Sequence, residues 1–177
     1  LDLVEGIRLE TEIPLVLFSY YNPIHCYGLE RFVDQAANVG VDGALMTDLP
    51  PEEGQDYKRL MDEKGLDTIF LLAPTSRDSR IRLISSYSTG FVYYISRTGV
   101  TGERDRLADT VRPMVEKIRT YTCKPIAVGF GISAPEHVIE ISRYADAVVV
   151  GSAIVRRIGE GEKDPDLVSQ IGAFVKT

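Results

Sequence analysis

Two glycine turns late in the chain have the composition of a phosphate-binding site. Gly129-Phe130-Gly131 follows an apolar run and opens a helical pattern, and Gly151-Ser152 does the same after the next run. Glycine lets a phosphate approach the backbone, and the amides at a helix N-terminus point at the anion. Ser152 adds a hydroxyl donor. Because the turns follow neighbouring runs, we expect them to form one shared phosphate site.

The segment Ser96-Arg-Thr-Gly-Val-Thr-Gly102 combines two glycines with hydroxyl and basic side chains. This composition predicts a loop able to close over a ligand, and a plain surface loop is the alternative. Large apolar side chains near the predicted strand ends could wall a pocket for a flat apolar ligand. They are Phe18, Tyr20, Leu45, Leu71, Tyr93 and Phe130. For Phe18 and Leu71, a place in the core is nearly as good an interpretation.

Groups for acid–base catalysis are few. Asp48 ends a predicted strand, where a barrel places catalytic groups, but it precedes Leu-Pro-Pro and fits a capping or turn role equally well. His25 is expected in a loop, His137 on a helix surface, and Glu52-Glu53 in a solvated first helical turn. The sequence contains no convincing Ser/His/Asp set and no metal-ligand cluster, so we expect no metal.

The composition is that of a globular protein, with 44% apolar and 26% charged residues. A net charge of −6 argues against nucleic acid as a partner. No run approaches the ~18 apolar residues of a membrane span, and the first residues do not resemble a signal peptide. Cys26 and Cys123 lie far apart, which favours reduced thiols in a cytoplasmic protein.

Apolar runs alternate with helical patterns along the whole chain, which predicts a parallel α/β sheet with right-handed crossovers in a single domain over residues 1–177. The predicted strands cover residues 14–21, 43–47, 68–73, 90–95, 125–128 and 147–150. The predicted helices lie around 29–37, 52–64, 81–87, 107–118, 138–141 and 166–175. A dinucleotide fingerprint is absent, because Ala134 stands where its third glycine is needed.

Glycine turns after the last two strands match the phosphate position of a (β/α)₈ barrel, which lies after strands seven and eight. We therefore expect about six of eight βα units, strands 3–8 of a phosphate-binding TIM barrel. The helical pattern at the start of the chain then corresponds to the end of helix two. An open sheet of this kind would expose both of its edges, so we expect low stability or dimerisation.

Several motifs together resemble the tryptophan synthase α subunit, in that family's order and over essentially all of the chain. They are residues 17–23, 40–53, 94–102, 129–133 and 151–155. The resemblance implies a (β/α)₈ barrel and a retro-aldol cleavage of indole-3-glycerol phosphate to indole and glyceraldehyde 3-phosphate. It implies no cofactor in this subunit. Indole would pass to a pyridoxal-phosphate β subunit in an αββα assembly.

The resemblance also implies roles for individual residues. The phosphate end would be held by Gly102, Gly129, Phe130, Gly131, Gly151 and Ser152. The indole would be surrounded by Phe18, Tyr20, Leu45, Thr47, Leu71 and Tyr93. Thr101 would hydrogen-bond the catalytic aspartate from the closing loop, and Tyr21, Asn22 and Pro23 would lie in a loop that contacts the β subunit.

One departure from the family pattern concerns the catalytic carboxylates, a Glu on strand two and an Asp in a Pro-Phe-Ser-Asp-Pro loop. This chain has no Pro-Phe-Ser-Asp motif, so we expect no catalytic residue in it and no activity if it truly begins at Leu1. Two alternatives stay open. One is a non-catalytic module that binds phosphate ligands or a β-type partner. The other is a phosphate-binding barrel isomerase or epimerase, which needs an acid–base pair that Asp48 alone does not supply.

Overall fold

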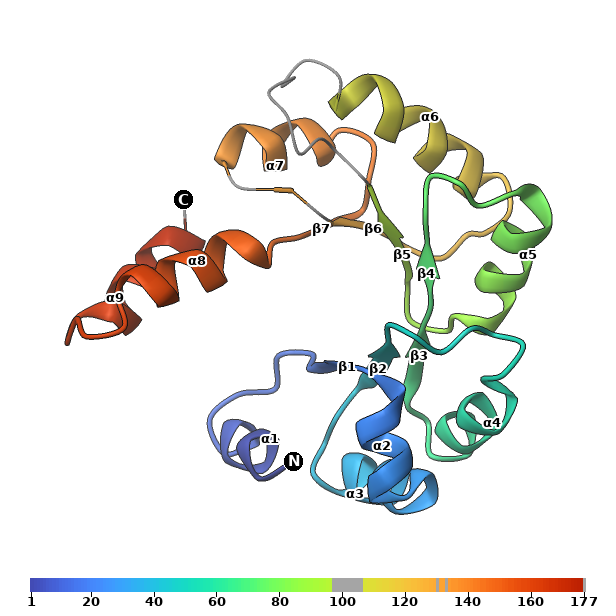
Figure 1. Cartoon of the computed structure of the whole chain (residues 1–177), viewed down its shortest axis with the longest axis horizontal. Helices are drawn as coiled ribbons and strands as arrows, with labels where there is room; N and C mark the ends of the chain where they lie inside the picture. Colours follow the sequence, from blue (N-terminus) through green and yellow to red (C-terminus); the bar gives the residue numbers. More distant parts are fainter. Residues whose placement is uncertain (97–106, 130, 133, 177) are drawn as a thin grey trace. The chain divides into compact units, whose positions relative to one another are not determined.

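The structure is a computed structural model that describes residues 1–96, 107–129, 131–132 and 134–176 (Figure 1). The strands are β1 (Val16–Ser19), β2 (Gly43–Met46), β3 (Asp67–Ile69), β4 (Leu71–Leu72), β5 (Val92–Ile95), β6 (Ile126–Gly129) and β7 (Ala147–Val149). The helices are α1 (Asp2–Arg8), α2 (Tyr21–Tyr27), α3 (Leu29–Asn38), α4 (Gln55–Glu63), α5 (Asp78–Tyr87), α6 (Leu107–Arg119), α7 (Pro135–Ile141), α8 (Ser152–Glu160) and α9 (Leu167–Val175).

The predicted alternation of strands and helices is confirmed, and the strand pairs β1–β2, β2–β3 and β6–β7 are parallel. The strands form two hydrogen-bonded sheets, ordered β1-β2-β3 and β4-β5-β6-β7, in place of the one open sheet that the pattern predicts. The predicted strand 68–73 is interrupted at Phe70, which separates β3 from β4. Two backbone N–H groups of this segment donate to side-chain hydroxyls and not to backbone carbonyls. The Thr68 N–H donates to Thr89 Oγ1 at 2.8 Å, and the Phe70 N–H donates to Ser88 Oγ at 3.1 Å.

Helix α2 corrects the prediction of a strand to residue 21 followed by a loop. β1 ends at Ser19, and Tyr21, Asn22 and Pro23 form the first turn of a helix that also contains His25. The Tyr21 N–H donates to Asp48 Oδ1 at 2.6 Å, so a carboxylate from a distant segment caps this helix. Proline is tolerated in a first turn because the amides there have no intrahelical partner. Gly28, with φ of +98°, ends the helix.

The chain divides into two compact units, each with its own buried residues. The first contains residues 1–72, 76–92 and 121–124, and its core includes Val33, Ala36, Tyr57, Met61 and Ile69. The second contains residues 73–75, 93–120 and 125–177, and its core includes Tyr94, Val115, Ile118, Ile126 and Val128. The expectation of a single domain over residues 1–177 stays a prediction. Among the described residues, no helix has the length and apolar character needed to cross a membrane.

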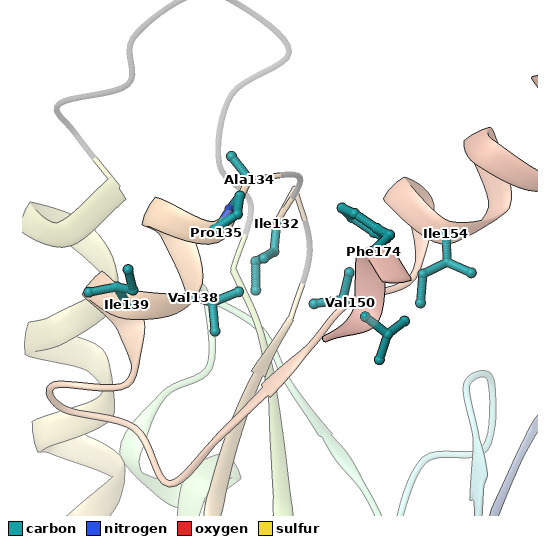
Figure 2. Close-up of a pocket in the computed structure, with 9 residues that line it drawn as sticks. Ile132, Ala134, Pro135, Val138, Ile139, Val150, Ile154 and Phe174 are labelled. Carbon is teal, nitrogen blue, oxygen red and sulfur yellow. The ribbon is translucent and has the colours of Figure 1, made fainter. Parts of the chain in front are cut away.

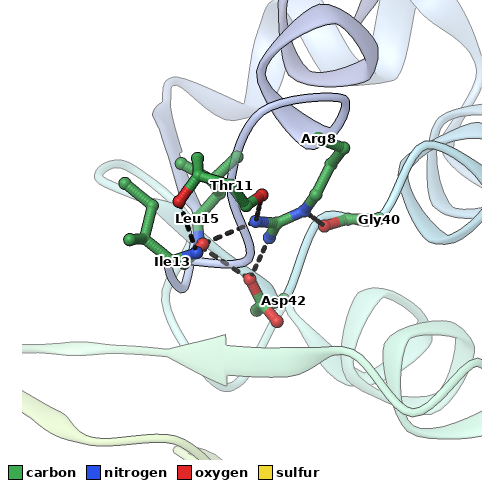
Figure 3. Close-up of polar contacts among 6 residues, drawn as sticks. All are labelled: Arg8, Thr11, Ile13, Leu15, Gly40 and Asp42. Carbon is green, nitrogen blue, oxygen red and sulfur yellow. Dashed lines mark hydrogen bonds and ion pairs between the residues drawn. The ribbon is translucent and has the colours of Figure 1, made fainter.

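Arg8, at the end of α1, ties the N-terminal segment to the turn before β2 (Figure 3). Its Nε donates to the Gly40 carbonyl at 2.7 Å and its Nη1 to the Ile13 carbonyl at 2.6 Å. Its Nη2 lies 2.5 Å from Asp42 Oδ2, and the same oxygen accepts from the Leu15 N–H at 2.6 Å. The planar guanidinium thus binds groups in the two segments that precede β1 and β2.

We expect Arg8→Lys to destabilise the protein by about 1–2 kcal/mol, because an ammonium cannot reproduce the fork of donors. Urea unfolding measures this change. Arg59→Lys is the matched control, since Arg59 pairs with Glu63 on an exposed face of α4, and such pairs contribute about 0.3–0.5 kcal/mol. Equal losses for the two variants would show that the contacts of Arg8 add nothing to an ordinary surface ion pair.

Candidate functional site

The two glycine turns lie at the carboxyl ends of neighbouring strands in the second unit. β6 and β7 pair in parallel with Gly129 opposite Val149, so their ends are level. The chain continues from β6 through Gly131 to α7 and from β7 through Gly151 to α8. Gly131 has a φ of +76°, a conformation that favours glycine. The structure therefore brings Gly129, Gly131, Gly151 and Ser152 to one edge of the sheet, as predicted.

The N-terminus of α8 is open for an anion. Gly151 is the N-cap and has no side chain to cap the helix, and its carbonyl accepts from the Ile154 and Val155 N–H groups at 3.0 and 3.1 Å. The first amides of a helix have no intrahelical acceptor, and the helix dipole adds partial positive charge there. A Cβ on Gly151 would meet no other atom within 4 Å, and both Gly151 and Ser152 are exposed. This end of the helix can therefore receive a ligand.

The side chain of Tyr93 packs closely against Gly129. A Cβ on it would lie 2.6 and 2.7 Å from ring atoms of Tyr93, which would then have to shift. Tyr93 is only 8% exposed, and burial raises the pKa of its phenol. The Gly129 carbonyl accepts hydrogen bonds from Ser96. The predicted site residues Thr101, Gly102 and Phe130 lie outside the described residues.

An apolar pocket of about 230 Å³ lies beside these turns (Figure 2). Its side chains come from α7, α8, α9 and the segments that follow β6 and β7. They are Ile132, Ala134, Pro135, Val138, Ile139, Val150, Ile154, Phe174 and Val175. The sequence patterns do not predict this pocket, although they predict helices over 138–141 and 166–175. No residue predicted to surround the indole lines it.

The remaining predicted substrate residues lie in the first unit. Phe18 and Leu45 are partners in the β1–β2 register, but Phe18 is 63% exposed and Leu45 only 2%. Tyr20, after β1, is 65% exposed. Thr47 and Leu71 line a pocket of about 300 Å³ at the ends of β2 and β4, together with Met46, Asp48, Leu49, Pro50, Pro51, Phe70, Arg80 and Ile84. Leu45 thus lies in the core of its unit, whereas Phe18 and Tyr20 present apolar surface.

The other titratable candidates have structural contacts. Asp48 accepts a hydrogen bond from the Tyr21 N–H and so caps α2, a contact with a distant segment and not the local one that its place before Leu-Pro-Pro indicates. Glu52 forms an ion pair with Arg80, and hydrogen bonds from the backbone and from Arg80 lower the pKa of its carboxyl. His25 is exposed on α2, and His137 lies on α7. Within the ranges that the structure describes, no three His, Cys, Asp or Glu side chains are grouped so as to hold a metal ion.

Parallel βα units that follow one another along the chain, with glycine turns at neighbouring strand ends, are the architecture of a (β/α)₈ barrel, of which this chain forms a part. The family described as tryptophan synthase alpha chain matches residues 1–175, and this chain belongs to that family. A relative from Geotalea uraniireducens is 51% identical over 175 residues, and one from Solibacter usitatus is 49% identical over 176. Each alignment covers 99% of this chain but only 65% and 66% of the relative, so the chain spans just under two thirds of their length.

Solved structures agree on the fold. A chain of the tryptophan synthase a2b2 complex from Pyrococcus furiosus is 37% identical, with a TM-score of 0.87 over 96% of this chain and 68% of its own length. Tryptophan synthase subunit alpha from Legionella pneumophila is 32% identical, with a TM-score of 0.87 over 97% of this chain and 64% of its own. The predicted partial barrel is thereby confirmed.

Proposed function

We propose that this chain is the substrate-binding part of a tryptophan synthase α-type lyase. In this proposal the phosphate of indole-3-glycerol phosphate binds at the turns Gly129–Gly131 and Gly151-Ser152, and the enzyme releases indole and glyceraldehyde 3-phosphate in tryptophan biosynthesis. The observation that supports it best is the level pairing of β6 with β7, which places both turns at one sheet edge. The uncapped N-terminus of α8 supplies amide donors for the phosphate.

The carbon–carbon cleavage needs groups that protonate indole C3 and remove a hydroxyl proton. Asp48 is engaged with the Tyr21 amide at 2.6 Å, so we assign it to helix capping. The catalytic Glu and Asp of the family are expected upstream of the matched residues, with Thr101 in support. A polypeptide that consists of these 177 residues is therefore expected to bind the phosphate without cleaving the substrate.

The proposal extends to the rest of the ligand and to a protein partner. Phe18, Tyr20, Leu45, Thr47, Leu71 and Tyr93 would surround the indole, and Gly102 and Phe130 would complete the phosphate site. The exposed first turn of α2, with Tyr21, Asn22 and Pro23, would contact the β subunit of an αββα assembly, as the family implies. Pyridoxal phosphate would belong to that partner, and the protein would be cytoplasmic.

Titration with glycerol 3-phosphate, a phosphate monoester that resembles one product, tests the phosphate site. We expect the amide resonances of Gly129, Gly131 and Gly151 to shift in ¹⁵N NMR spectra, together with that of Ser152. Glycerol, which lacks the phosphate, is the control and should move none of them. Shifts confined to other residues, or none at all, would contradict the proposal.

Asp48→Asn separates the lyase proposal from the isomerase alternative. We expect this variant to keep phosphate binding and to lose less than about 1 kcal/mol of stability, because the amide oxygen of Asn can still accept from the Tyr21 N–H. Asp48→Ala, which removes the acceptor, should cost about 1 kcal/mol in urea unfolding. If the wild type isomerised a sugar phosphate and the stable Asn variant did not, Asp48 would be an acid–base group and our assignment would be wrong.

A further inference from the structure

Ser96 is a buried polar residue directly after β5, and the function proposed above does not use it. It is 1% exposed, and both of its donors reach the same acceptor. The Ser96 N–H lies 3.0 Å from the Gly129 carbonyl oxygen, and the Ser96 hydroxyl lies 3.1 Å from it. Gly129 is the last residue of β6 and the first of the proposed phosphate turn. One serine therefore holds the carbonyl at the point where the strand becomes the turn.

The hydroxyl is not needed for pairing of the strands, because the Ser96 backbone amide already supplies that hydrogen bond. Its bond to the same oxygen adds a second constraint on the direction of the Gly129 carbonyl. The ring of Tyr93 supplies a third, since it occupies the space beside the Gly129 Cα. Gly129 is thus held on its carbonyl and on its Cα, and a backbone fixed before binding loses less entropy when a ligand arrives.

We propose that Ser96 is a positioning residue for the phosphate site, whose hydroxyl orients the Gly129 carbonyl and thereby fixes Gly129 before a phosphate monoester binds. The inference rests on the function proposed above. Ser96 acts through Gly129 and does not contact the ligand. It therefore affects affinity for the phosphate group.

The test compares Ser96→Ala with Ser88→Ala in the 177-residue protein, using glycerol 3-phosphate as the probe. Ser88 is a matched control, because it is 0% exposed, its Oγ accepts from the Phe70 N–H at 3.1 Å, and it belongs to the other compact unit. The hydrogen bond of the Ser96 hydroxyl is made in the free and in the bound protein, so it enters the Kd only through the order that it imposes on Gly129. The energy of one hydrogen bond, about five-fold in an equilibrium constant, is therefore the upper limit of the effect. We expect Ser96→Ala to raise the Kd by about three- to five-fold, and Ser88→Ala to leave it within about two-fold of the wild type.

Ser96→Thr retains the hydroxyl and should restore the Kd to within about two-fold of the wild type. If Ser96→Ala does not fold, Ser96→Cys replaces it, because a thiol fills the site but is a weak donor, and a raised Kd is again expected. An unchanged Kd for a folded Ala or Cys variant would overturn the role of Ser96 while the phosphate site stands. Equal rises for the Ser96 and Ser88 variants would also overturn it. No binding of glycerol 3-phosphate by the wild type would overturn the proposed function and this inference together.

Discussion

Gly151→Asp is expected to weaken phosphate binding by about thirty-fold or more while leaving the protein slightly more stable. Aspartate is among the best N-cap residues and interacts favourably with the N-terminus of a helix, so we expect a gain of about 0.5 kcal/mol in urea unfolding. The space around Gly151 accepts the side chain, since a Cβ there meets no other atom within 4 Å. A carboxylate at the proposed anion site would repel the ligand by about 2 kcal/mol or more, which raises the Kd about thirty-fold or more.

Gly151→Asn is the matched control, because asparagine caps a helix about as well as aspartate and carries no charge. The Kd of the Asn variant for glycerol 3-phosphate should be about ten-fold lower than that of the Asp variant. This difference should shrink at high salt, because salt screens the repulsion. Equal Kd values for the Asp and Asn variants would mean that the ligand does not bind at the N-terminus of α8. A stability loss in both would show that Gly151 serves the fold and not the ligand.

Local patterns predicted most of the fold, since buried parallel strands appear as continuous apolar runs. The glycine turns were predictable for the same reason, because each follows such a run directly. Helix α2 was not, because its cap is the Asp48 carboxylate, 27 positions along the chain from Tyr21. The interruption between β3 and β4 depends in the same way on hydroxyls of Ser88 and Thr89. The start of α2 and the break between β3 and β4 both involve hydrogen bonds between residues far apart in the sequence. A pattern of neighbouring residues does not show such bonds.

The candidate site was likewise predictable only in part from local sequence patterns. Gly129, Gly131, Gly151 and Ser152 were predicted from their types and their place after strands. The sequence pattern indicates only that Ser96 begins a polar loop, because a serine that follows a strand has no local sign of being buried. Nor could the sequence show that Phe18 is largely exposed and its register partner Leu45 buried. Alternation along a strand tells which residues share a face, but the surroundings of that face depend on packing.

Gly129→Ala is expected to destabilise the protein by about 3 kcal/mol, the largest stability change that we predict for a single methyl group. The new Cβ would lie 2.6 and 2.7 Å from Tyr93 ring atoms and closer still to the hydroxyl, so the ring would have to move. Tyr93 is 8% exposed and follows the first residue of β5, which leaves it little room. Overpacking of this kind costs about 1–3 kcal/mol or more. For a chain of this size, it should lower the melting temperature by about 6–12 °C.

The control is Gly151→Ala, whose added methyl meets no atom within 4 Å and should cost less than about 1 kcal/mol through its weaker N-cap. If the Tyr93 ring causes the loss in the Gly129→Ala variant, the two substitutions should not be additive. The double variant Gly129→Ala with Tyr93→Leu should be about 2 kcal/mol more stable than the sum of the two single changes predicts. Similar losses for the two glycine variants, or additive effects in the double variant, would show that Tyr93 does not pack on Gly129. Recovery would establish that a residue proposed for the indole wall also supports the phosphate turn, so that these two parts of the proposed site are mechanically coupled.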